Sequence, residues 1–377
     1  MSGDLETNPP PAPPRGETGE ERGGGDASKR PAATQAGDGG ADAAAVERIA
    51  EARSRRRFDR AAEEIEAALQ RHPDSTGVLV QRAWLRREEG NPEGALSEFD
   101  AILRKEPNNE EALVGKAALL RARRSLDELE ALLAHALKQH PDSVSLQNES
   151  GWFYLDTGRL DEAERVFGAV LGKEGENRDA LHGTVAMLRK LRKFGDAQAL
   201  LDRALRVHEH DRGLLCERAW VELEQDRLGP ALAAFEAVLR EDEAGKWFDD
   251  EHERHVAWKV FLQTELRDLD GAERTIRSAL VHFRESALLR TDLGWVQFHR
   301  REYREALQTF ESVPDTAPEQ DSSLQGRIAA LRAQGEFGAA RRLADDAVLR
   351  LPKSAGIISE RAWLALAMGD VTEARSE

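Results

Sequence analysis

The chain has 377 residues and a formal net charge of −16, with 40% apolar, 33% charged and 6% aromatic residues. This length allows either two or three domains or one elongated array, and the many charged and few aromatic residues argue against an all-β fold. The single cysteine, Cys216, excludes an internal disulfide and a cysteine-based zinc site, and it indicates a reducing compartment.

The distribution of apolar residues argues against a membrane protein. No apolar run approaches the roughly eighteen residues that a spanning helix needs. The first thirty residues contain no hydrophobic segment typical of a signal peptide. We therefore expect a cytoplasmic protein without a membrane partner, and the negative net charge disfavours wholesale binding to nucleic acid.

Residues 1–41 are expected to form a disordered tail. The first forty residues contain nine Gly and six Pro and almost no large apolar side chain. Ordering such a segment cannot repay the conformational entropy that would be lost. From Asp42 onward the composition changes and the sequence begins to repeat.

The rest of the chain divides into segments of 34 residues. Position 20 of the segments is Ala in nine of ten cases, position 24 is usually aromatic or aliphatic, and position 32 is Pro in five of the nine complete segments. This spacing predicts a hairpin of two helices in each segment, ended by Pro and stacked on its neighbours to bury its apolar face. The segments are 42–75, 76–109, 110–143, 144–177, 178–211, 212–245, an insertion at 246–252, then 253–286, 287–320, 321–354 and a partial 355–377.

These columns together resemble the tetratricopeptide repeat. The resemblance covers residue 42 to the C-terminus and includes a small residue at position 8 and glycine at position 15 in Gly90, Gly158, Gly335 and Gly369. Positions 4, 11 and 32 depart from the family pattern in several segments. The resemblance implies an all-α fold, a right-handed α-solenoid of stacked antiparallel helix pairs whose first helices line a concave face. It also implies interaction with another protein instead of catalysis.

A second, longer period of two segments, or 68 residues, is superimposed on the first. Position 9 alternates between tryptophan and a residue that is usually alanine, which leaves two hypotheses open. The indoles could form a platform in the groove for an extended peptide or a helix, with Asn148 as a polar contact. Alternatively, each indole packs into the space that a neighbouring Ala leaves, which the strict alternation favours, or one ring edge stays exposed. The tryptophans are Trp84, Trp152, Trp220, Trp295 and Trp363.

Basic residues recur at the turns of the first, third and fifth segments. Stacking would align them into a positive ridge that could bind an acidic peptide tail or a nucleic-acid backbone. The alternative is an ordinary solvated helix end, where cations favour the helix dipole. Because no interleaved aromatic motif accompanies them, nucleic acid is the weaker partner. The candidates are Arg53, Arg56, Arg121, Arg124, Arg189 and Arg192.

The sequence contains no recognisable catalytic or metal-binding constellation. Residues 168–174 resemble a phosphate loop but lack its spacing and its Ser or Thr. His252 and His255 share a helix face without a third ligand, and Cys216 is expected to be a packed thiol. We therefore expect no enzyme, no catalytic residue, no metal and no cofactor.

The sequence predicts a scaffold or adaptor that holds a peptide or helix of a partner, or another domain of the same polypeptide, in the groove. Two alternatives are the sensing arm of a larger effector protein truncated at residue 377, and an acidic-tail or nucleic-acid binder that uses the arginine ridge. The partial last segment would leave Trp363, Leu364 and Leu366 partly bare. We therefore expect either that the natural polypeptide continues or that this end docks onto a partner or a second copy.

Overall fold

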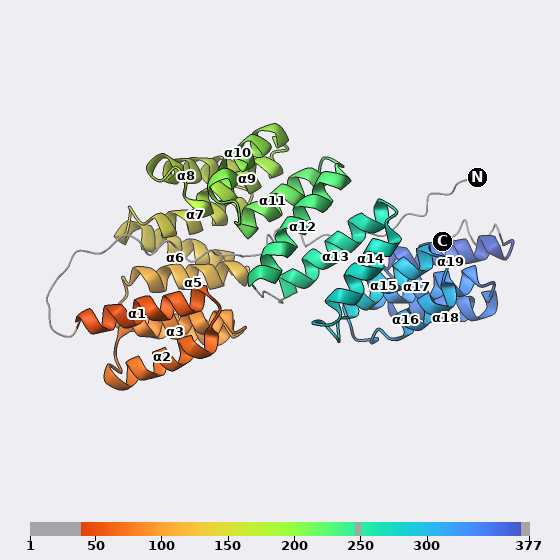
Figure 1. Cartoon of the computed structure of the whole chain (residues 1–377), viewed down its shortest axis with the longest axis horizontal. Helices are drawn as coiled ribbons and strands as arrows, with labels where there is room; N and C mark the ends of the chain where they lie inside the picture. Colours follow the sequence, from red (N-terminus) through yellow and green to blue (C-terminus); the bar gives the residue numbers. More distant parts are fainter. Residues whose placement is uncertain (1–38, 246–249, 371–377) are drawn as a thin grey trace. The chain divides into compact units, whose positions relative to one another are not determined.

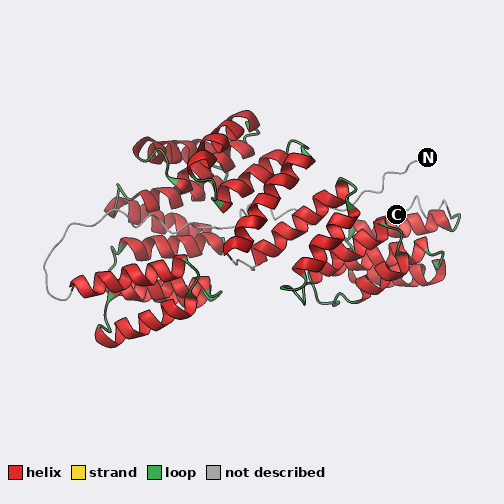
Figure 2. Ribbon diagram, viewed as in Figure 1, coloured by secondary structure: helices red, strands yellow, loops and turns green. Residues whose placement is uncertain are grey.

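The computed structural model describes residues 39–245 and 250–370, and every regular element in them is an α-helix (Figures 1 and 2). The expected tail therefore lies outside the described residues except for residues 39–41, which belong to α1. The contacts divide the described chain between residues 217 and 218 into two units, each of which is described by itself. The helices of residues 39–217 are α1 Gly39–Ser54, α2 Phe58–Arg71, α3 Thr76–Glu88, α4 Pro92–Lys105, α5 Glu110–Ala122, α6 Leu126–Gln139, α7 Val144–Asp156, α8 Leu160–Lys173, α9 Arg178–Lys190 and α10 Phe194–Val207.

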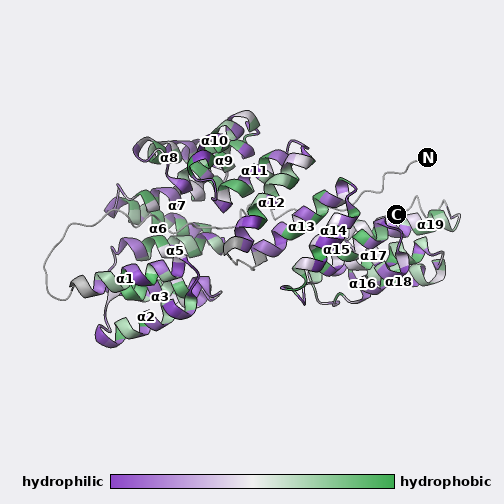
Figure 3. Cartoon of the chain, viewed as in Figure 1, coloured by the Kyte–Doolittle hydropathy of each residue, from purple (hydrophilic) through white to green (hydrophobic). Residues whose placement is uncertain are grey.

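The division falls inside α11, Arg212–Leu223. The second unit continues with α12 Leu228–Gly245, α13 Asp250–Glu265, α14 Leu269–Ala279, α15 Ala287–His299, α16 Tyr303–Glu311, α17 Gln320–Ala333, α18 Phe337–Arg350 and α19 Ala355–Ala367. Successive helices pack in pairs in sequence order within each unit. Figure 3 shows hydrophobic and hydrophilic residues alternating along these helices, as expected for helices with one buried face.

Short polar side chains start the first helix of most pairs. Oδ1 of Asn109 accepts a hydrogen bond from the backbone N–H of Ala112 at 3.0 Å, and Oγ of Ser286 accepts one from Leu289 at 2.9 Å. These contacts satisfy N–H groups that have no partner within the helix. The residues that cap in this way all occupy the last position of a 34-residue segment: Ser75, Asn109, Ser143, Asn177, Asp211, Ser286 and Ser354.

The turn inside each pair holds one residue with positive φ, at position 15 of the segment. Gly90 has φ of 78° and Arg124 has φ of 58°. Glycine adopts this conformation without strain, whereas other residues lose about 1 kcal/mol. The residues are Arg56, Gly90, Arg124, Gly158, Arg192, Asp226, Arg267, Arg301, Gly335 and Gly369.

Buried phenylalanines lie against glycines of the next pair. Phe167 is fully buried, and a Cβ placed on Gly183 would lie 2.2 Å from its Cζ. Phe310 and Gly326 repeat the arrangement with a corresponding distance of 2.3 Å. Because a ring occupies the space of the missing side chain, the glycine column lets neighbouring pairs approach closely.

The inserted segment changes the helices on both sides of it. Helix α12 has 18 residues, and α13 begins at Asp250, three residues before the expected segment start. Nδ1 of His252 and Nδ1 of His255 lie 3.1 and 3.3 Å from the same buried Oδ2 of Asp242, which ties α13 to α12. Trp247 and Phe248 of the insertion lie outside the described residues.

Candidate functional site: the surface of the first helices

The first helices of successive pairs lie against one another. In the first unit α1, α3, α5, α7 and α9 contact in sequence, and in the second unit α13, α15, α17 and α19 do the same. Among the described residues, α2, α4, α6 and α8 do not contact one another, nor do α14, α16 and α18. The first helices therefore form a continuous surface in each unit, whereas the second helices are separated.

All five predicted tryptophans lie on the first helix of a pair, and we call their helices α3, α7, α11, α15 and α19 the tryptophan helices. Trp152 is buried with 7% exposure, whereas Trp84, Trp220 and Trp295 are half-buried. Four of the rings pack edge-on against a phenylalanine of the same segment, with centroid distances between 5.3 and 5.8 Å. The pairs are Trp84–Phe99, Trp152–Phe167, Trp220–Phe235 and Trp295–Phe310.

The last tryptophan has a different environment. Trp363 in α19 is 56% exposed, and Leu366 is 45% exposed. Leu364, which was expected to be partly bare, is instead buried at 2% exposure. The side chain of Leu364 thus belongs to the core of the second unit, and the large exposed apolar side chains of α19 are Trp363 and Leu366.

Three arginines of the predicted ridge belong to ion pairs between first helices. Nε of Arg189 in α9 lies 2.9 Å from Oε2 of Glu217 in α11. Nε of Arg121 lies 3.3 Å from Oε2 of Glu149, which is likewise buried. Arg53 bonds to Gln81 at 2.6 Å and to the Glu88 carboxylate. The charges of these arginines are therefore compensated within the protein.

Two of these arginines, Arg53 and Arg121, also lie over tryptophan rings. The guanidinium carbon of Arg121 lies 5.4 Å from the ring centroid of Trp152, and that of Arg53 lies 5.9 Å from Trp84. The acidic or amide partner stands three residues before the tryptophan, so both occupy one helix face. We call this combination the arginine–acid–tryptophan set: an arginine, a polar acceptor 28 residues later, and a tryptophan three residues after that.

The acids of these sets respond differently to burial. Burial alone would raise the pKa of Glu217, but Arg189 and His182 stabilise its charged form and lower the pKa to about 2. Burial raises the pKa of Glu360, whose single cationic partner Arg332 offsets this only in part. The number of cations around each carboxylate accounts for the difference.

The remaining ridge candidates, Arg56, Arg124 and Arg192, occupy the positive-φ position of the turns and are exposed. Arg56 and Arg192 lie over the rings of Phe58 and Phe194, each with a distance of 5.2 Å. The structure therefore divides the six candidates between inter-helix ion pairs and turn positions.

Asn148 lies at the junction of α7 and α9 and is 4% exposed. Its Nδ2 donates to Oδ1 of Asn177 at 3.0 Å, and the same Oδ1 caps α9 through Ala180. Oδ1 of Asn148 is buried and accepts no hydrogen bond. This side chain thus fixes the start of α9 and leaves one acceptor unused.

Sequence reasoning missed an aromatic cluster where α13 follows α12. Trp258 lies 4.9 Å from Trp220 and 5.6 Å from Phe261, and it stacks on Phe235 at 6.3 Å. Trp258 occupies the column that holds Gly115, Gly183 and Gly326 in other segments. A comparison of the segments at this position would have predicted the cluster, because a tryptophan cannot replace a glycine there without repacking of its neighbours.

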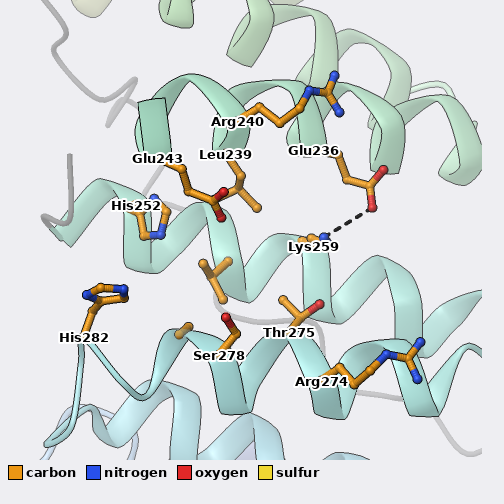
Figure 4. A pocket seen from close by; sticks show the side chains of 12 residues that line it. Glu236, Leu239, Arg240, Glu243, His252, Lys259, Arg274, Thr275, Ser278 and His282 are labelled. Atoms are coloured by element: carbon orange, nitrogen blue, oxygen red, sulfur yellow. Dashed lines mark ion pairs between the residues drawn. The ribbon is translucent and has the colours of Figure 1, made fainter. Parts of the chain in front are cut away.

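A separate cavity of about 780 Å³ lies among α12, α13 and α14 (Figure 4). An ion pair between Glu236 and Lys259 of 3.3 Å crosses one side of it, and Arg240 and Arg274 are exposed residues of its lining. Because both signs of charge line this cavity, its electrostatics favour no single class of charged ligand.

Two further properties of the described residues concern metal ions and membranes. They contain no group of three or more His, Cys, Asp or Glu residues arranged to hold a metal ion. None of the described helices combines the length and apolar composition that crossing a bilayer requires.

Two family models match the repeated part of the chain. One family model described as tetratricopeptide repeat matches residues 52–119 and 86–148, and another with the same description matches residues 188–246 and 264–321. The matched ranges span more than half of the chain, and neither model describes an enzyme. No curated protein matches the chain.

Several solved structures are similar at low identity. A tetratricopeptide repeat protein from Parabacteroides merdae is 16% identical, with a TM-score of 0.45 over 68% of this chain and 98% of that one. Cut9–Hcn1, an APC/C hetero-tetramer, gives 14% identity and a TM-score of 0.48 over 89% of this chain and 73% of the other. PilW, a type IV pilus biogenesis factor, gives 21% identity and a TM-score of 0.47 over 58% and 99%.

Proposed function

The chain belongs to the tetratricopeptide repeat family, and from this premise we propose that it binds a segment of a partner polypeptide along the surface of its first helices. Proteins of this family are generally scaffolds for protein interactions. The finer proposal is that an extended peptide or a helix of the partner lies across successive first helices, and that the protein acts without catalysis.

The observation that carries this proposal is the regular placement of partly exposed indoles beside polar groups on adjacent first helices. Trp84, Trp220 and Trp295 are half-buried, so each ring has one part anchored in the core and another open to a ligand. Tryptophan and arginine are enriched among the residues that contribute most to binding at protein interfaces.

The inter-helix ion pairs support the proposal in a second way. Arg121–Glu149, Arg189–Glu217 and Arg332–Glu360 each tie one first helix to the next. A surface held in this way loses little conformational entropy when it binds, so the partner bears most of the ordering cost. The same pairs weaken the arginine-ridge alternative, because three of its six arginines already have carboxylate or amide partners.

Photo-crosslinking tests which helices contact the partner. A p-benzoylphenylalanine is placed at Ser145, an exposed residue of α7 three positions before Asn148, and at the control position Glu164, which is exposed on α8. We expect polypeptide adducts in native lysate from Ser145 and not from Glu164. Adducts from Glu164 alone, or equal adducts from both positions, would overturn the proposal.

A further inference from the structure

Helix α13 is the first helix of the pair that precedes the tryptophan helix α15. It differs from α5, α9 and α17, which hold the same place before α7, α11 and α19. In α5, α9 and α17, three residues spaced by three along one face are glycine, alanine and arginine, as in Gly183, Ala186 and Arg189 of α9. The corresponding residues of α13 are Trp258, Phe261 and Thr264. This face of α13 thus gains two aromatic rings and loses the cation. Thr264 is buried, and its hydroxyl donates to the carbonyl oxygen of Val260 at 2.9 Å.

The carboxylate that the missing arginine would pair with is still present. Asp292 in α15 stands 28 residues after Thr264 and three before Trp295, so it completes the spacing of an arginine–acid–tryptophan set. Its Oδ2 is buried and accepts no hydrogen bond, and no cation among the described residues pairs with it. The residue as a whole stays partly exposed.

The charges around Asp292 also favour a cation at this place. Burial, together with the carboxylates of Glu319, which precedes α17, and Glu253 in α13, raises the pKa of Asp292 to about 8. These two acids also pair with no cation in the described residues. All the neighbouring charges that act on Asp292 are therefore negative, in contrast to the surroundings of Glu217.

We propose that Asp292 and Trp295 form a receptor for the guanidinium group of an arginine that a bound polypeptide supplies. The equivalent acids Glu149, Glu217 and Glu360 each hold an arginine of this same chain. The inference rests on the proposed function only for the source of the arginine. It adds to that function the chemistry of one contact, in the second unit of the protein.

Arginine fits this receptor better than lysine does. A guanidinium can bond to a carboxylate and stack on an aromatic face at the same time, whereas an ammonium is a compact and strongly hydrated charge. Arg121 shows the combination, since it pairs with Glu149 and lies over Trp152. The indole of Trp295 is held in place by its N–H, which donates to Oγ of Ser322 at 2.9 Å.

The test uses the whole chain and N-acetyl-L-argininamide as the probe. The indole N–H signal of Trp295, assigned with Trp295→Phe, is followed in ¹H–¹⁵N spectra during the titration. We expect a saturable shift with a dissociation constant on the order of 1 mM, as one charged and stacked contact allows. N-acetyl-L-lysinamide should bind at least about tenfold more weakly.

Three variants provide the controls. Thr264→Arg restores the arginine of the other sets, so it should abolish the response to the probe. Asp292→Asn should also abolish it, because an amide cannot ionise to pair with the guanidinium. Arg332→Thr vacates the equivalent position beside Glu360 and should create a second responsive site at Trp363. An unchanged response in Thr264→Arg or Asp292→Asn, equal binding of lysinamide, or no shift in the wild type would overturn the inference.

The outcomes separate this inference from the proposed function. A partner that cross-links from Ser145 and binds Thr264→Arg as tightly as the wild type overturns the arginine receptor and leaves the scaffold function standing. A Trp295 shift with argininamide, combined with partner adducts from Glu164 only, leaves the receptor standing and removes the proposed use of the first-helix surface.

Discussion

Arg189 of α9 forms an ion pair with the buried Glu217 of α11, in which Nε of the arginine lies 2.9 Å from Oε2 of the acid. His182 approaches the other carboxylate oxygen, with a distance of 3.4 Å from its Nε2. The pair connects two successive first helices, and its spacing recurs along the chain. Because each such pair orders the surface on which the tryptophans lie, the packing of the repeat and its binding surface share the same residues.

Glu217→Gln should destabilise the protein by about 3 kcal/mol at neutral pH, because it removes the buried carboxylate whose charge Arg189 and His182 stabilise. The folded pKa of Glu217, about 2, lies below the unfolded value of 4.5. The stabilisation is therefore complete above pH 4.5 and is lost as pH falls toward 2. Denaturant unfolding between pH 2 and 7 measures this. A variant as stable as the wild type at pH 7 would contradict the account.

Asp292→Asn should stabilise the protein, in contrast to Glu217→Gln. The folded pKa of Asp292 is raised from 3.8 to about 8, so ionisation of this residue weakens the native state progressively as pH rises through this interval. The stability advantage of the variant should grow by at most about 1.4 kcal/mol per pH unit between pH 4 and pH 8. Paired unfolding curves at pH 4, 6 and 8 check the trend. An advantage that does not change with pH would show that Asp292 titrates normally.

Gly183→Ala should destabilise the first unit, because the new Cβ would lie 2.2 Å from Cζ of the fully buried Phe167. The expected loss is about 1 to 3 kcal/mol. Gly168→Ala in α8 is the matched control, since nothing lies within 4 Å of its Cβ position and alanine favours a helix by up to about 1 kcal/mol. Thermal unfolding should therefore move in opposite directions for the two variants, and equal shifts would rule out the close approach.

Arg301→Gly should raise the stability of the second unit by about 1 kcal/mol, since Arg301 has φ of 66° at the turn position. Gly335→Arg, at the equivalent turn with φ of 80°, should lower it by a similar amount. Melting temperatures measure both changes. If the glycine variant melts lower than the wild type, contacts of the Arg301 side chain outweigh the backbone strain.

The repeat pattern made the helical fold predictable from sequence. The alanine column at position 20 and the proline column at position 32 gave the period, and they follow from local rules of helix packing and helix ending. The turns with positive φ were also predictable, because Gly90 and Gly158 occupy the same segment position as Arg124. The lengthening of α12 before the insertion was not predicted, since the period says nothing about where extra residues continue a helix.

The surface of the first helices was only partly predictable. The tryptophan column was visible, but the burial of Trp152 depends on His182 and Phe167, which belong to other helices. The arginine and the acid of each pair stand 28 residues apart, at different positions of successive segments. The sequence does not show that they pair, because this depends on the contact between first helices such as α9 and α11. Trp258 went unnoticed because its column contains glycine elsewhere.

The most direct test of the account is a double-mutant cycle between residues 264 and 292, measured by equilibrium unfolding at pH 7 with Thr264→Arg, Asp292→Asn and the double variant. The account predicts that the new arginine stabilises the protein only when Asp292 is present, with a coupling of at least about 1 kcal/mol. A coupling of zero within error would contradict it, because the arginine introduced at position 264 would then not face the carboxylate at all.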